Sequence, residues 1–297
     1  MSAPNDLQGV GGAIRPAPDP LADEAVALLH GSLAEAWEEG VPAAGLRERL
    51  ARRAARSAGL NRTMVNVRRR ERVLLEQTPQ RVVHELYRRA PGGQPQRPGE
   101  PLRVRMVQLS PAGAWLVPAG DPGVGRDWLL VRGQALLQPE AAAPLSLGPL
   151  DYHVQSAGAS RAGACICAGA EGALVLLRER ALQPGDPAHA GESRTVRESP
   201  DQWEDYAPLI RRRLLWQDGP VAAMLWLAEP GASVPHHRHG HDEECLMLQG
   251  DLFQDDYLLC EGDYQLAPSG SAHESVSTDT GALIYAHGDL QMQIVGP

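Results

Sequence analysis

Residues 231–273 place histidines, one glutamate, glycines and a proline at fixed intervals, and this spacing constrains the fold more than any other feature. A first group consists of Gly231, His237, His239, Glu243 and Gly250, and a second group of Gly262, Pro268, Gly270 and His273. Isolated glycines and prolines between short apolar runs mark bends and turns of strands. The spacing therefore favours short antiparallel strands that bring polar side chains together.

The two histidines of the first group lie two residues apart, so on a strand their side chains project from the same face. Glu243 follows after a tight loop, and His273 comes from a later strand. Three imidazoles and one carboxylate suit Zn(II), Fe(II), Mn(II), Ni(II) or Cu(II). We predict that His237, His239, Glu243 and His273 bind one divalent metal ion per chain. The alternative is a solvated histidine-rich loop at residues 235–241 that binds nothing specifically.

From Met64 onward the sequence consists of short β-type runs separated by proline and glycine, which is typical of antiparallel sandwiches and barrels. Two series of these runs align with each other at three places in the same order. Residues 117–133 match 234–250, residues 151–158 match 263–270, and residues 172–175 match 281–284. We therefore predict a mainly β chain that arose by tandem duplication.

The first copy lacks the metal ligands. Its residues at the four aligned positions are Gly120, Pro122, Arg126 and Arg161. Glycine and proline offer no side-chain ligand, and two arginines would repel a cation. This copy is expected to be metal-free. The two arginines either bind an anion or are solvated at the barrel rim, and the solvated rim is favoured.

The N-terminal region predicts a short helical extension. Residues 21–39 and 42–58 carry apolar side chains at helical spacing. Ten arginines against two glutamates between residues 47 and 72 leave a nucleic-acid or acidic partner open. That segment has no interleaved aromatic residue and no DNA-binding motif, so we favour a solvated helix face and do not expect nucleic-acid binding.

The second copy resembles the cupin superfamily, and within it the cupin-like domain of ChrR-type anti-sigma factors. The resemblance is carried by residues 235–239 (PHHRH), 243–250 (EECLMLQG) and 262–273 (GDYQLAPSGSAH), and weakly by 45–50 (GLRERL). It implies two tandem cupin barrels, each a double-stranded β-helix or jelly roll. The expected organisation is a flexible tail at 1–20, a helical extension at 21–60, a degenerate metal-free cupin at 62–180, a linker at 181–200 and a metal-binding cupin at 201–297.

The resemblance also implies a function. In ChrR-type proteins an N-terminal domain holds a sigma factor through its own zinc site, and the cupin binds zinc and responds to oxidative stress. Residues 1–60 here contain one histidine, His30, and no cysteine, so that N-terminal zinc site cannot form. The resemblance implies a regulatory or sensory bicupin with zinc as the first choice of metal and iron, manganese or nickel as alternatives. A sigma factor or another regulatory protein could then bind residues 21–60, and family members suggest a homodimer.

Two other functions fit the same ligands. One is an Fe(II)- or Mn(II)-dependent dioxygenase or related enzyme, in which Tyr264, Cys245 or His241 would add polar groups to the pocket. The other is a scaffold whose metal only braces the barrel. Whether the chain is an enzyme is left open by the sequence.

Composition excludes some classes of protein. No stretch approaches the roughly 18 consecutive apolar residues of a spanning helix, and residues 1–20 have neither the charged start nor the apolar run of a secretory signal. The four cysteines form no C-x-x-C pair, although Cys165 and Cys167 are expected on one face of a strand. We expect a cytoplasmic protein with reduced cysteines and no membrane partner.

Overall fold

The described part of the chain lies within one compact unit, Arg52–Pro297. A computed structural model describes residues 52, 63–89, 101–121, 123–140, 142–155, 162–182 and 193–295. The predicted tail at 1–20 and, apart from Arg52, the predicted helical extension at 21–60 lie outside these residues. The described residues form strands and two short 3₁₀ helices, so the prediction of a mainly β chain is confirmed. No helix among them could cross a membrane.

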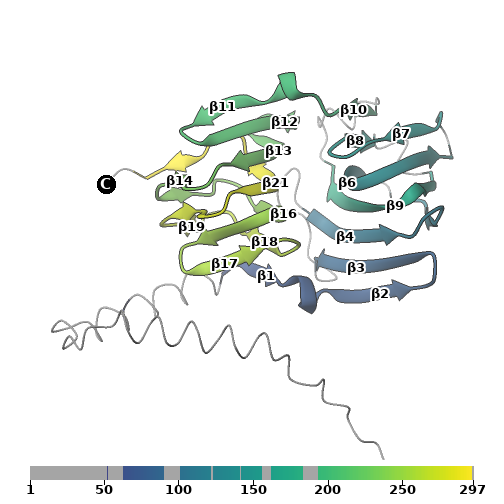
Figure 1. The fold of residues 1–297 in the computed structure, drawn as a ribbon, viewed down its shortest axis with the longest axis horizontal. Helices are drawn as coiled ribbons and strands as arrows, with labels where there is room; N and C mark the ends of the chain where they lie inside the picture. The colour runs from purple at the N-terminus through teal and green to yellow at the C-terminus, as the bar shows by residue number, and fades with distance from the viewer. Residues whose placement is uncertain are drawn as a thin grey trace, which may run out of the picture. The chain divides into compact units, whose positions relative to one another are not determined.

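The first set of strands, here called the N-terminal β half, forms one nine-stranded antiparallel sheet system (Figure 1). Its main path runs in the order β10-β8-β6-β9-β4-β3-β2, with β5 beside β9 and β7 beside β6. The strands are β2 (Val73–Gln77), β3 (Arg81–Arg88), β4 (Pro101–Leu109), β5 (Ala114–Val117), β6 (Val124–Pro139), β7 (Leu145–Leu147), β8 (Tyr152–Gln155), β9 (Ala164–Ala181) and β10 (Arg194–Val196).

The second set, the C-terminal β half, consists of the remaining strands. Its main path runs β1-β18-β16-β21-β13-β12-β11, and β15 pairs with β19 and β22 in a separate three-stranded sheet. The elements are β1 (Val65–Val67), η1 (Arg69–Glu71), η2 (Pro200–Gln202), β11 (Glu204–Ala207), β12 (Ile210–Asp218), β13 (Val221–Ala228), β14 (Ser233–Val234), β15 (His237–Arg238), β16 (Glu243–Gln254), β17 (Tyr257–Cys260), β18 (Tyr264–Ala267), β19 (Ala272–His273), β20 (Val276–Ser277), β21 (Ala282–Asp289) and β22 (Gln293–Ile294).

The halves exchange one edge strand each. Strand β1 precedes the whole N-terminal β half in sequence, yet it pairs with β18 of the C-terminal β half. Strand β10 directly precedes β11–β22 in the sequence, as β1 precedes β2–β9, yet it pairs with β8 of the N-terminal β half. Because β10 lies within residues 181–200, the described end of that predicted linker is part of a sheet.

Strand register is the same in the two halves. Leu129 pairs with Tyr152 on one side and Leu176 on the other, and Leu246 pairs with Tyr264 and Tyr285 in the same way. Each central strand also has a register shift at the equivalent place, between Leu130 and Arg132 in β6 and between Met247 and Gln249 in β16. The three sequence matches therefore coincide with matching strand pairs.

A glycine follows each of these register shifts. Gly133 and Gly250 have φ angles of 81° and 76°, in the left-handed region that favours glycine. A Cβ at Gly133 would lie 2.1 Å from the carbonyl oxygen of Gly172, and a Cβ at Gly250 would lie 2.0 Å from that of Gly281. Both positions therefore need glycine for its conformation and for its size.

Replacing Gly250 with alanine is expected to lower the free energy of unfolding by about 2 kcal/mol, because the new methyl group adds backbone strain and forces the β16–β21 pair apart. Urea unfolding followed by far-ultraviolet circular dichroism measures this change. Gly219→Ala is the control, since Gly219 also has a positive φ but a Cβ there meets nothing within 4 Å. An equal loss in the two variants would contradict the steric part of the explanation.

Apolar side chains form three clusters. One fills the inside of the N-terminal β half around Trp128 and Leu130. A second fills the inside of the C-terminal β half around Met224 and Cys245. The third contains residues of both halves, among them Leu129, Tyr152, Leu246 and Tyr264. Alternate residues of β6 and β16 thus point into their own half or into the interface between the halves.

Buried charges lie in this interface. Arg178 of β9 donates from Nη1 to Asp127 Oδ2 at 3.2 Å and from Nε to Glu244 Oε2, and its Nη2 lies 3.3 Å from His287 Nδ1. Burial by itself would lower the pKa of Arg178, but Glu244, Tyr285 and Asp127 outweigh it and the pKa is raised. The guanidinium therefore stays charged and links a carboxylate from each half.

Candidate metal centre

The predicted ligands are brought together by strand pairing and one turn. His237 on β15 lies directly opposite His273 on β19 in the antiparallel register. His239 follows two residues later, where its backbone N–H donates to Ser271 at 3.0 Å and its carbonyl accepts from Gly270 at 2.7 Å. Glu243 begins β16 immediately after that turn.

Three of the four residues meet the distance requirement of one metal ion. Ligand atoms of His237, His239 and Glu243 all lie within 4.8 Å of one another. The ring of His273 lies close to this group, with its centroid 5.5 Å from that of His237 and 5.1 Å from that of His239. The structure therefore provides a possible site of two histidines and one glutamate, with a third histidine beside it.

The imidazole nitrogens support a metal at this place. His237 Nδ1 lies 3.0 Å from the carbonyl oxygen of Pro235, and His273 Nδ1 lies 3.3 Å from Asp255 Oδ2. Such contacts fix a ring and leave its Nε2 free as a ligand. Nε2 of His239 and Nε2 of His273 are buried and have no partner among the described residues. Buried nitrogens without partners are costly, and a bound cation would satisfy them.

Electrostatics also favour a cation. Burial alone would raise the pKa of Glu243, but His239, His237 and His273 outweigh it and lower the pKa to about 2. Burial alone would lower the pKa of His239, but Glu243 outweighs it and raises that pKa. Glu243 is thus ionised at neutral pH. Its carboxylate would then bind a metal ion that displaces the proton of His239.

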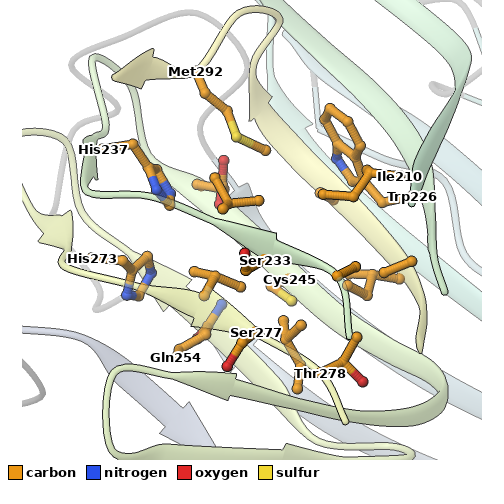
Figure 2. Close-up of a pocket in the computed structure, with 18 residues that line it drawn as sticks. Ile210, Trp226, Ser233, His237, Cys245, Gln254, His273, Ser277, Thr278 and Met292 are labelled. Atoms are coloured by element: carbon orange, nitrogen blue, oxygen red, sulfur yellow. The ribbon is translucent and has the colours of Figure 1, made fainter. Parts of the chain in front are cut away.

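A mainly apolar pocket of about 70 Å³ opens at the ligands. Figure 2 shows His237 and His273 at one end of it and Ile210 and Trp226 toward the other, with Cys245 between them. No arginine or lysine lines it, and the described charged or ionisable lining groups are confined to Glu243, Cys245 and the two histidines. The pocket volume is several times the roughly 10–15 Å³ of accessible space that one water molecule needs, so it has room for a small ligand.

The three candidate helper residues have different surroundings. Cys245 lines the pocket, and burial followed by Glu243 raises the pKa of its thiol, which keeps it protonated. His241 is directed to Asp289 through Nδ1. Tyr264 donates its hydroxyl to Glu244 at 2.8 Å and lies in the interface between the halves. Of the three, Cys245 alone lines the described pocket.

Sequence reasoning missed several residues that shape the site. The Asp255 carboxylate contacts His273 and accepts the backbone N–H of Glu274 at 2.7 Å. Asp289 accepts the N–H of Gly240 and holds the turn that carries His239. Gly288 makes room for the metal-site carboxylate, since a Cβ there would lie 2.9 Å from Glu243 Cγ. Of these residues, only Asp255 has a recognisable sequence feature, since it is an aspartate in the turn after β16.

A guanidinium occupies the position in the N-terminal β half that aligns with Glu243. Arg126 is 1% exposed, with its Nε 3.2 Å from Glu179 Oε1, and Glu179 Oε2 lies 2.9 Å from Arg105 Nη2. Arg126 also donates to the carbonyl of Pro118 at 2.5 Å. The expectation that Arg126 is solvated at the rim is therefore wrong, because Arg126 is buried and the partly buried Glu179 offsets its charge.

The other aligned positions of this half give less information. Gly120 is partly buried, and Pro122 and Arg161 lie outside the described residues. Cys165 and Cys167 share one face of β9 as expected, with their sulfur atoms 3.5 Å apart. Burial and the neighbouring thiol raise the pKa of Cys165 to about 11, so this thiol is protonated at neutral pH.

Comparison with known families agrees with the sequence resemblance over the second half of the chain. Residues 192–291 match the family model of the ChrR cupin-like domain. No curated protein sequence matches the chain.

Solved structures share the fold over most of the chain. A glyoxylate-induced protein from Pseudomonas aeruginosa superimposes with a TM-score of 0.60 at 15% identity, covering 79% of this chain and 92% of that one. A variant of oxalate decarboxylase from Bacillus subtilis gives 0.52 at 14% identity, covering 76% and 77%. A protein described as a dioxygenase from Nostoc punctiforme gives 0.53 at 16% identity, covering 80% and 88%. At these identities the similarity is one of fold.

Proposed function

We propose that this chain, which the family model and the shared fold support as a member of the cupin superfamily, is a metal-dependent enzyme for a small, mainly apolar molecule. The metal would be one divalent ion held by His237, His239, Glu243 and His273. The observation that carries the proposal is the apolar pocket that ends at three of these residues. A metal that only braced a barrel would have no need of such a space beside it.

The donor set fits several chemistries. Three imidazoles and a carboxylate suit zinc, iron, manganese or nickel. When bound, such an ion supplies Lewis-acid polarisation and, for iron or manganese, a centre for oxygen-dependent oxidation. Because no arginine or lysine lines the pocket, the described side chains favour a neutral ligand or one with a single anionic group directed at the metal. Among the fold relatives, an oxalate decarboxylase and a protein described as a dioxygenase are consistent with an enzyme.

A regulatory role is the second candidate, and the match of residues 192–291 to the ChrR cupin-like domain favours it. In that case the metal would be zinc, and an oxidant or small molecule that reaches the pocket would change the ligand geometry. Cys245 is a poor direct sensor, because burial raises the pKa of its thiol and keeps it in the unreactive protonated form. Deleting residues 1–60 should then abolish binding of a regulatory partner.

We also infer that the two β halves are tandem cupin barrels derived from one ancestor. The identical strand order and the equivalent positions of Gly133 and Gly250 support this inference. In the N-terminal copy the ion pair of Arg126 and Glu179 would stand where the C-terminal copy holds its metal. One metal per chain follows from that replacement.

Two measurements test the enzyme proposal. One is elemental analysis of protein purified without added metal, and the other is oxygen uptake after the chain has been reloaded with Fe(II) or Mn(II). We expect iron or manganese to support oxygen consumption in the presence of small apolar substrates. Ala286→Val should reduce this activity while one metal per chain is retained, because Ala286 lines the pocket. Stoichiometric zinc with no oxygen uptake after reloading would favour the regulatory candidate instead.

A further inference from the structure

A second cavity, of about 190 Å³, lies between the N-terminal β half and the β17–β18 turn of the C-terminal β half. Its polar lining consists mainly of basic side chains, Arg69, Arg72, Arg132 and His84, with Glu261 as the acidic member. None of these residues lines the metal pocket. The cavity is therefore a separate candidate binding site.

Asp263 fixes the segment that carries two of these arginines, Arg69 and Arg72. Arg68 Nη1 donates to Asp263 Oδ2 at 2.8 Å, and the backbone N–H of Arg69 donates to Asp263 Oδ1 at 2.8 Å. Arg69 and Arg72 then lie against Gly262, where an added Cβ would be 2.8 Å from Arg69 Cδ and 3.0 Å from Arg72 Nη2. The predicted solvated helix face is thus wrong for this end of the basic segment, which is a strand, β1, and a 3₁₀ helix, η1, fixed to the second half.

The positive charge in the cavity is only partly offset by carboxylates, namely Glu261 in the lining and Asp263 beside it. Glu261 Oε1 lies 3.9 Å from Arg69 Nη1, and no carboxylate among the described residues pairs with Arg72 or Arg132. Arg72 donates to the carbonyl of Gly262, and its Nε is buried without a partner among the described residues. Burial and then Arg69 lower the pKa of Arg72 to about 10, so it stays charged at neutral pH.

The histidine contributes a neutral donor. Burial and then Arg72 lower the pKa of His84, which leaves its imidazole uncharged at neutral pH. Three arginines against one glutamate therefore give the cavity a net charge of two positive units. A phosphate monoester carries about −1.5 to −2 charges at pH 7, and guanidinium groups bind its oxygens in pairs.

We propose that this cavity binds the phosphate group of a small organic phosphate. Arg72 and Arg132 would contact the phosphate oxygens, and the apolar walls at Met106, Leu174 and Met247 would contact the organic part. Because residues from both β halves line the cavity, a bound phosphate would also favour their association. The site does not depend on the metal centre or on the reaction proposed there.

Calorimetric titration of the full chain with phenyl phosphate tests the proposal. We expect saturable binding of one equivalent that weakens with salt, and Arg72→Met and Arg132→Met should each lower the affinity about tenfold or more. Arg132→Met tests the site without touching the contacts of Asp263. Arg70→Met is the matched control, since Arg70 lies on the same η1 segment with 85% of its side chain exposed, and it should bind as the parent does.

Three further titrations distinguish this site from the metal centre and show whether it prefers a phosphate to a carboxylate or an uncharged ligand. Phenyl phosphate should bind equally well to the Glu243→Gln variant, and benzyl alcohol, which has no charge, should not bind at millimolar concentrations. Loss of phosphate binding in Glu243→Gln would show that the anion goes to the metal and would overturn the proposal. So would tighter binding of benzoate than of phenyl phosphate, absence of binding at millimolar phenyl phosphate, or unchanged affinity in Arg72→Met and Arg132→Met.

Discussion

Replacing Glu243 with glutamine should lower the affinity of the chain for a divalent metal by more than about 100-fold. Loss of a residue that only supports a ligand commonly costs about 10–100-fold, and Glu243 is the anionic member of the group itself. Glutamine keeps the size of the side chain but removes the charge that the three histidines stabilise. Competition with a coloured chelator measures the affinity, and elemental analysis after dialysis measures the metal content.

The neighbouring histidines provide the controls. His236 precedes the ligand His237 but has the opposite strand parity, so His236→Ala should keep one metal per chain. His237→Ala combined with Glu243→Gln should abolish binding. His273→Ala decides whether the fourth predicted ligand binds the ion, since a loss comparable to that of Glu243→Gln would make it a ligand. Full metal occupancy in the double variant would show that the ligands have been wrongly assigned.

Replacing Arg178 with methionine should destabilise the chain by about 3–5 kcal/mol, because removing one member of a buried ionic group leaves the others without compensation. Asp127 and Glu244 each expose 1% of their side chains and would lose this partner, although Arg180 would still contact Asp127. The loss would appear as a lower urea midpoint. Metal-free protein should be used, so that metal binding does not add to the measured stability.

Two comparisons make this result specific to the buried network. Arg70→Met removes an exposed arginine and should change the free energy of unfolding by no more than about 0.5 kcal/mol. The double variant Arg178→Met, Glu244→Gln should lose less free energy of unfolding than the sum of the losses in the two single variants. In the double variant, glutamine at position 244 leaves no unpaired charge there. Additive losses, or an unchanged midpoint in Arg178→Met, would contradict the assignment.

The proximity of His237, His239 and Glu243 could be predicted because it depends on short-range rules. Two histidines at alternate positions of a strand share a face, and a tight turn returns the chain so that Glu243 lies near them. Asp255, Asp289 and Gly288 could not be found in this way, since they lie 18 to 49 residues from the site residues that they contact. Their roles depend on strand pairs that the local sequence does not specify.

The neighbours of the predicted residues were harder to foresee than the residues themselves. The alignment identified Arg126 in place of a ligand, but it could not identify Glu179, which lies on a strand 53 residues away. Tyr264 was a candidate polar group of the pocket under the enzyme hypothesis. It instead shares the outward parity of Leu246, its partner across the sheet, and reaches Glu244 in the interface. The outward faces of the two halves carry both apolar and charged side chains, and their contacts become evident only when both halves are in place.

The exchange of edge strands limits how far this protein can be divided. A fragment that began at residue 201 would lose β1, together with the Arg68 contact to Asp263, and would expose the edge of β18. A fragment that ended at residue 180 would lose β10 and expose the edge of β8. Unpaired edges of this kind promote association between chains. The two β halves are therefore not independent modules, and recombination that moved one half into another protein would have to carry a strand from beyond the boundary suggested by the sequence alignment.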